Sequence, residues 1–268
     1  MLGVLFIKWL STALVVVGVS TAVARLGPRL GGVLAGTPIV LGPGYFFMLR
    51  EQPPAFVAEA ALGSLHAMLA TLTFCLCYVL LAGGFGASAS VALAAVIWLP
   101  LAAVAASLPG GVTLGLATFL LALALALRLM RSLGLVRGTV SEPPRWGDLL
   151  MHGSLAGIIV CLATVVLDSI APAVSGIALS FPIGMLTIAL TLHQRHGPGM
   201  ARATLADTQL GMLSLVAFSA VMAASVESLP PALVFVLALG ASLLVSGLLW
   251  FLPRWLPATS SHDDPGFP

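Results

Sequence analysis

The sequence predicts an all-α integral membrane protein with about nine transmembrane helices, arranged as an inverted repeat of five and four helices. Apolar residues make up 60% of the 268 residues and charged residues only 7%, whereas an ordinary soluble domain is roughly 25% charged. Long apolar stretches follow one another, and Pro and Gly recur at a fixed offset of 144 residues. The net charge of +2 comes from loop arginines and does not indicate a nucleic-acid-binding surface.

Nine stretches approach the ~20 apolar residues that are needed to cross a ~30 Å hydrocarbon layer. Their ranges are 3–24, 30–49, 55–81, 88–107, 112–130, 149–167, 173–193, 203–224 and 231–252. The first stretch could also be a secretory signal peptide, because it ends in the small residues of 22–24. We expect it to remain as a helix, because Lys8 follows an apolar start and the stretch 149–167 takes the same place in the second half.

The repeat is visible at residues that control the backbone. The matched pairs are Pro28 and Pro172, Gly32 and Gly176, Pro38 and Pro182, Pro54 and Pro198, Met68 and Met212, Leu69 and Leu213, and Phe74 and Phe218. Pro and Gly dictate where a helix can run, so these pairs indicate a shared backbone geometry. We divide the chain into a first repeat (1–130), a cytoplasmic linker (131–148), a second repeat (149–252) and a cytoplasmic tail (253–268) that we expect to be disordered.

Basic residues predict the orientation. With nine spans, successive loops alternate between the two sides of the membrane, and only Lys8 and Arg50 fall on one side. The residues on the other side are Arg25, Arg29, Arg128, Arg131, Arg137, Arg145, Arg195, Arg202 and Arg254. Because cytoplasmic loops carry the excess of Lys and Arg, we expect a plasma (inner) membrane protein with its N-terminus outside and its C-terminus in the cytoplasm. The second repeat then starts on the opposite side and runs inverted.

Short motifs resemble those of the small GlpM-type membrane proteins. They are Ile7-Lys8 before an apolar helix, Gly32-Val33-Leu34-Ala35-Gly36-Thr37-Pro38, an Arg50-Glu51 turn, and Glu59-Ala60-Ala61-Leu62. The second half repeats the pattern more loosely from Ser175 to Pro182. The chain looks like two such units fused through an added fifth span. The resemblance implies a membrane fold and no particular substrate, because the family has no settled biochemical role.

The candidate substrate site lies where Pro and Gly fall deep in apolar stretches. The second span contains Thr37-Pro38 and Gly42-Pro43-Gly44, and the seventh contains Ser180-Phe181-Pro182. We expect the second helix to be interrupted and the seventh to be kinked or interrupted, since proline removes a backbone donor. Freed backbone groups must then be satisfied by protein or line a wet cavity. The predicted substrate-binding residues are Thr37, Pro38, Gly42, Gly44, Ser180 and Pro182. Alternatively, the prolines only kink the helices for packing.

The few ionisable residues near the membrane are candidates for proton coupling or gating. They are Lys8, Glu59, His66, His152 and Asp207. Helical spacing places Glu59 and His66 on one face with Gly63 between them, and Asp207 takes the place of Gly63 in the second repeat. Charges at such depth usually face the interior of the bundle or a water-filled path.

Structural alternatives remain open for four of these residues. Glu59 could be an interfacial carboxylate, Asp207 could pair with Arg202, and Lys8 could snorkel outward. A lone histidine such as His66 could simply pack against a carbonyl group.

The sequence lacks the motifs of soluble enzymes: a phosphate-binding glycine loop, a two-His metal spacing and a Ser/His/Asp order. Cys75, Cys77 and Cys161 lie in apolar runs and are expected to act as small hydrophobes. We therefore predict a non-enzymatic protein without a cofactor or metal. Its predicted partners are the lipid bilayer and a small-molecule or lipid substrate. The favoured function is transport or export of a small solute, with proton coupling as an option. A lipid or lipid-linked carrier flippase and a non-transporting scaffold remain alternatives.

Overall fold

A computed structural model describes residues 2–25, 38–132, 145–166 and 171–251. Every regular element among these residues is helical. Eight helical stretches within them are long and apolar enough to cross a membrane. The predicted second span, 30–49, falls partly outside the described residues. Its described part is an 11-residue helix, so the ninth span stays a prediction.

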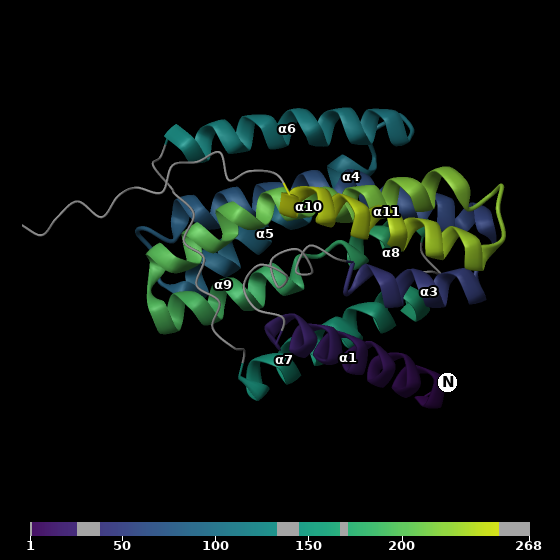
Figure 1. The fold of residues 1–268 in the computed structure, drawn as a ribbon, viewed down its shortest axis with the longest axis horizontal. Coiled ribbons are helices and arrows are strands. Elements are labelled where there is room, and N and C mark those ends of the chain that lie inside the picture. Colours follow the sequence, from purple (N-terminus) through teal and green to yellow (C-terminus); the bar gives the residue numbers. More distant parts are fainter. Residues whose placement is uncertain (1, 26–37, 133–144, 167–170, 252–268) are drawn as a thin grey trace, which may run out of the picture.

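Figure 1 shows the arrangement of the described helices. The first half contains α1 (Leu2–Arg25), α3 (Leu41–Glu51), α4 (Pro54–Leu81), α5 (Ala87–Ala106) and α6 (Val112–Ser132). The second half contains α7 (Trp146–Cys161), the π-helical turn η1 (Leu162–Val166), α8 (Pro172–Leu179), α9 (Ile183–His196), α10 (Pro198–Ser225) and α11 (Pro231–Phe251). Several of these helices begin with Pro at the first helical position, where its missing N–H costs no hydrogen bond.

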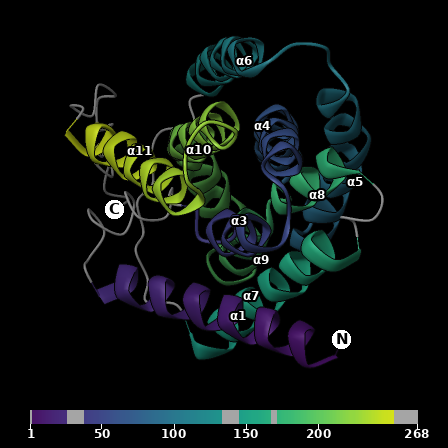
Figure 2. The same ribbon diagram turned by 90° about the vertical axis from the view of Figure 1, so that its right-hand side faces the viewer.

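Helix boundaries recur at the same offset as the matched Pro and Gly residues. Helix α4 spans 54–81 and α10 spans 198–225, so both ends match, and α1 and α7 start at the matched positions Leu2 and Trp146. Helices α5 and α11 also start at matched positions, Ala87 and Pro231. The matched helices α1 and α7 pack side by side, as do α4 and α10. No described helix matches α6 in this way, and α6 lies at the edge of the bundle in Figure 2.

Helix α4 is the most buried candidate span, and α8 packs against it at very close range. A Cβ atom added at Gly176 would lie 1.8 Å from the carbonyl oxygen of Ala60, so only glycine fits there. One turn earlier on α8, the carbonyl oxygen of Ala173 would lie 2.8 Å from a Cβ atom added at Gly63 of α4. Small residues commonly allow this approach between membrane helices, where packing rather than a hydrophobic driving force holds helices together.

The seventh predicted span is interrupted, not merely kinked. Helix α8 ends at Leu179, and α9 begins at Ile183 after Pro182 with φ −77° and ψ 52°. In the described part of the second span, Gly42-Pro43-Gly44 does not break a helix. These residues form the first turn of α3, where Pro43 needs no intrahelical partner for its nitrogen. Residues 26–37, which precede this region, lie outside the described residues.

Candidate functional site

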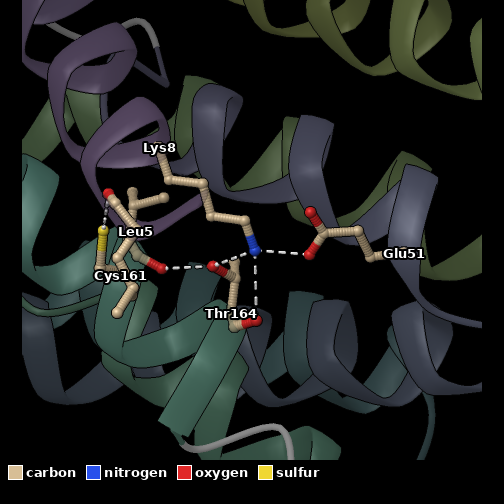
Figure 3. Close-up of polar contacts among 6 residues, drawn as sticks. Leu5, Lys8, Glu51, Cys161 and Thr164 are labelled. Carbon is tan, nitrogen blue, oxygen red and sulfur yellow. Dashed lines mark hydrogen bonds and ion pairs between the residues drawn. The ribbon is translucent and has the colours of Figure 1, made fainter. Parts of the chain in front are cut away.

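Lys8 is a charged residue buried inside the first span. Its side chain is 3% exposed, and its Nζ donates hydrogen bonds to Glu51 Oε2 and to Thr164 Oγ1, the latter at 3.1 Å (Figure 3). A weaker contact of 3.4 Å reaches the carbonyl oxygen of Thr164. The snorkelling interpretation of Lys8 is therefore wrong. The carboxylate of Glu51 gives the ammonium group a partner inside the fold, and buried charges are stable only when paired in this way.

The site is built from three elements that are far apart in the sequence. Lys8 comes from α1, Glu51 from the last turn of α3, and Thr164 from the π-helical turn η1. The Thr164 hydroxyl donates to the carbonyl oxygen of Val160 at 2.8 Å, so an oxygen lone pair remains to accept from Lys8. Single π-helical turns are rare and frequently occur at functional sites. The ammonium group also lies 5.6 Å from the centre of the Phe47 ring.

A second polar group lies at the break in the seventh span. Ser180 Oγ donates to the carbonyl oxygen of Gly176 at 2.9 Å, and Ser64 Oγ on α4 donates to the same oxygen at 2.8 Å. The hydroxyl groups of Tyr45 on α3 and Ser64 are 2.6 Å apart. All four residues are buried. These side chains satisfy the end of α8 within the protein, as a lipid environment requires.

The other side of the break is held by α4 and α5. Thr71 Oγ1 donates to the carbonyl oxygen of Ser180 at 3.0 Å, and Trp98 Nε1 donates to Thr71 Oγ1 at 3.0 Å. The Trp98 ring meets the Phe181 ring edge to face, with centres 5.0 Å apart. The interrupted segment is therefore fixed by specific contacts to its neighbouring helices. A fully satisfied network of this kind makes a region rigid.

The described members of the predicted substrate site lie in different surroundings, and their role in binding stays a prediction. Gly44 of α3 lies against the side chain of Leu179, at the end of α8, because an added Cβ atom would be 2.5 Å from Leu179 Cδ2. Helix α3 thus meets the broken span at Gly44. Pro182 is buried and caps the start of α9. Thr37 lies outside the described residues.

Pro38 and Gly42 instead line an apolar cavity between α1, α3 and α11, whose volume is about 540 Å³. In Figure 2, α3 lies between α1 and α11. The lining side chains are apolar apart from one hydroxyl. They come from Ser11, Val15, Val19, Pro38, Ile39, Gly42, Pro43, Phe46, Phe47, Phe235, Leu239 and Leu243. Ser11, Val15 and Val19 follow helical spacing, so one face of α1 forms a wall of the cavity.

Glu59, Gly63 and His66 have different surroundings on α4, so a role of this helix face in proton coupling or gating stays a prediction. Glu59 is exposed, and Gly63 packs against Ala173 of α8. His66 is 4% exposed and lies beside Gly115 of α6. Its Nε2 atom has no hydrogen-bond partner among the described residues. The exposure of Glu59 agrees with the alternative of an interfacial carboxylate.

The remaining candidates lie in the second half. Asp207 is half-buried, and Arg202 directs its Nε atom to the carbonyl oxygen of Val79 at 2.8 Å. His152 is half-buried with its imidazole next to Gly184 of α9, and its Nε2 atom has no partner in the described part of the chain. His152 lies 144 residues after Lys8, but among the described residues no ion pair equivalent to Lys8–Glu51 is found at its side chain.

Helices α7 and α9 are joined by their own ion pair. The Nη2 atom of Arg195, in the last turn of α9, lies 2.8 Å and 3.0 Å from the carboxylate oxygens of Asp148, in the first turn of α7. Arg195 lies 144 residues after Glu51, at the same offset as the matched Pro and Gly residues. Matched positions at the ends of α3 and α9 therefore form ion pairs to the matched helices α1 and α7, with the charges exchanged.

Sequence reasoning missed the partners of these groups. It did not identify Glu51, Thr164, Ser64 or Trp98 as members of a polar network. The Arg50-Glu51 turn held the only usable signal, because it carries a carboxylate in a chain with few charges.

Chemically, the described residues can hold two ion pairs, a hydroxyl network and an apolar cavity. They contain no group of three His, Cys, Asp or Glu side chains that could hold a metal ion. Comparison of the chain with protein families, characterised proteins and solved structures gives no match.

Proposed function

We propose that the chain is a multi-pass membrane transporter that moves a small solute by alternating access between two inverted repeats. The observation that carries the proposal is that the matched positions Glu51 and Arg195, at the ends of α3 and α9, each form an ion pair, with Lys8 of α1 and with Asp148 of α7 respectively. The recurrence of helix boundaries in the two halves and the broken seventh span support it. Transporters built from inverted repeats commonly contain discontinuous helices at the repeat interface.

In the proposed cycle the two ion pairs close opposite ends of the transport path. If the repeats are inverted, Lys8–Glu51 lies toward the outside and Asp148–Arg195 toward the cytoplasm. Both pairs are formed in the described conformation, which we assign in this cycle to a state closed at both ends. Opening to one side would break one pair while the other holds.

The exposure of the charged groups fits closures that open reversibly. Side-chain exposure is 3% for Lys8, 39% for Glu51, 25% for Asp148 and 27% for Arg195, so each pair has at least one partly exposed partner. Fully exposed ion pairs contribute about 0–1 kcal/mol, whereas breaking a buried pair costs about 3–5 kcal/mol. Partly exposed pairs fall between these limits. The difference between two conformations of a working protein is also a few kcal/mol.

A reporter experiment with two matched positions tests the proposal. Ser11 lines the cavity on α1, and Leu155 on α7 takes its place in the second repeat. Cysteine at either position, in a chain lacking Cys75, Cys77 and Cys161, would be labelled in liposomes with a membrane-impermeant maleimide from each side.

Glu51→Gln should increase external labelling of Ser11→Cys and decrease cytoplasmic labelling of Leu155→Cys, each by about tenfold for ~1.4 kcal/mol of shifted equilibrium. Arg195→Gln should have the opposite effect on both reporters. Glu59→Gln is the control, because it removes an exposed carboxylate outside both ion pairs. Local loosening alone would change only the reporter nearest the mutation. That result, or a change of both reporters in the same direction, would contradict alternating access.

A further inference from the structure

The apolar cavity between α1, α3 and α11 has cationic groups near one end. Phe46 and Phe47 of α3 both line the cavity. The guanidinium carbon of Arg50 lies 5.4 Å from the centre of the Phe46 ring, and Lys8 Nζ lies 5.6 Å from that of Phe47. A volume of about 540 Å³ falls within the ~300–1,000 Å³ that is usual for small-molecule sites.

The two cations differ in what they can still bind. Lys8 is buried and already neutralised by Glu51. Arg50 is exposed, and no carboxylate in the described part of the chain pairs with it. A guanidinium group presents five donors that match carboxylate and phosphate oxygens. Arg50 can therefore accept an anionic group next to the aromatic end of the cavity.

The cavity lining argues against a polar solute. Ser11 supplies the only side-chain hydroxyl among the described lining residues, and this hydroxyl donates to the carbonyl oxygen of Ile7 at 2.6 Å. A sugar or free amino acid would leave its own polar groups without partners there, which costs several kcal/mol. An alkyl chain has no such groups. Each methylene group removed from water contributes about 0.8 kcal/mol.

We propose that this cavity binds the alkyl chain of a single-chain anionic amphiphile, with its phosphate or carboxylate group on Arg50. The claim that this amphiphile is the transported cargo rests on the proposed function. The claim that it binds in the cavity does not depend on that function. Phe46 and Phe47 line the cavity and also lie next to the two cations, so one ligand can use both parts of the site.

Binding to the purified full-length chain in a nonionic detergent tests this assignment. Hexadecyl phosphate and the zwitterionic hexadecylphosphocholine share one alkyl chain and differ in net charge, and native mass spectrometry can measure both. The unaltered chain should prefer hexadecyl phosphate by about tenfold, as expected for one charge-assisted hydrogen-bonded contact. Arg50→Gln should remove this preference, while hexadecylphosphocholine binding stays unchanged. Arg131→Gln, at an exposed arginine on α6, is the matched charge control and should keep the preference.

A second variant tests the chain-binding part. Gly42 lines the cavity and has open space where a Cβ atom would be, so Gly42→Leu should fill part of it and weaken binding of both amphiphiles by about tenfold or more. Gly240→Leu on α11 also meets open space, lies outside the described lining and should leave binding unchanged.

Three outcomes would overturn the assignment. They are equal binding of both amphiphiles by the unaltered chain, a loss of the preference for hexadecyl phosphate in Arg131→Gln as large as that in Arg50→Gln, and undiminished binding of both amphiphiles in Gly42→Leu. Equal binding would mean that the cavity takes up the acyl chains of bilayer lipids without selecting for the charge of the headgroup. The cysteine reporters at 11 and 155 separate this result from the transport proposal. Selective binding without reciprocal labelling supports the site and rejects alternating access, whereas reciprocal labelling without selective binding rejects only the cargo class.

Discussion

Substitution of Gly176 by Ala tests the close contact between α8 and α4. The added Cβ atom would lie 1.8 Å from the carbonyl oxygen of Ala60 and 3.0 Å from the backbone nitrogen of Ser64. Both neighbours are backbone atoms of a buried helix, so a rotamer change cannot relieve the overlap. The two helices must move apart by ~1 Å or more, since real Cβ contacts below 3.0 Å essentially never occur.

The expected destabilisation follows from three contributions. Overpacking a well-packed core costs about 1–3 kcal/mol. The two hydrogen bonds that the carbonyl oxygen of Gly176 accepts, from Ser64 and Ser180, would be lost or lengthened, at about 0.6 kcal/mol each in a membrane protein. Replacing Gly by Ala within a helix returns about 1 kcal/mol. The net loss of stability is about 1–3 kcal/mol, or a fall in Tm of roughly 2–12 °C.

Thiol reactivity during heating can measure this shift. Cys75 is fully buried, so a fluorogenic maleimide should label it only when the protein unfolds, in a chain whose other two cysteines are replaced by Ala. Gly240→Ala is the matched control, because it makes the same change in helix α11 where a Cβ atom meets open space. Its Tm should stay constant or increase slightly. If Gly176→Ala and Gly240→Ala unfold at the same temperature, the close contact with Ala60 is not part of the folded protein.

Three further predictions concern topology, the broken span and the exposed carboxylate. Cysteine at Gln52 should react only with external reagents and cysteine at Val140 only with cytoplasmic ones, and labelling of both from one side would reject the inverted arrangement. Thr71→Val and Trp98→Phe each remove one end of a buried hydrogen bond, so each should lower Tm, and the double variant should lose less stability than the sum. Additive losses in that thermal measurement would show that the two side chains act independently. Glu59→Gln should leave solute flux into liposomes and its pH profile unchanged, because Glu59 is exposed on α4; a flattened profile would place this carboxylate on the coupling path.

Local and periodic features made the helices predictable. Eight predicted spans correspond to long apolar helical stretches in the structure, because span length and apolarity are set by the bilayer and can be read from a single stretch. Pro54 and Pro198 mark the starts of α4 and α10, since proline suits the first helical position. Gly176 and Pro182 mark a close contact and a break, respectively.

The partners of polar residues could not be predicted in the same way. Lys8 bonds to Glu51 and Thr164, which lie far from it along the chain, and no local pattern specifies such a pairing. Helical spacing placed Glu59 and His66 on one face, but it could not indicate that Gly63 packs against α8, that His66 lies beside Gly115 of α6, or that Glu59 is exposed. The Gly-Pro-Gly motif at 42–44 shows a further limit. The same three residues can break a helix or form its first turn, and only the preceding backbone decides which occurs.

The position of α6, which no described helix matches in the second half, has a consequence for how such a chain could arise. A unit that crosses the membrane an even number of times returns to its starting side, so a simple tandem duplication would give two copies with the same orientation. One additional crossing between them reverses the second copy. With the nine spans proposed above, α6 is that crossing. It contacts α4 and α10 from outside, so it can act as a topological spacer without forming the contacts between α1 and α7. Gain of one apolar segment between duplicated genes would be sufficient to convert a parallel pair into an antiparallel one.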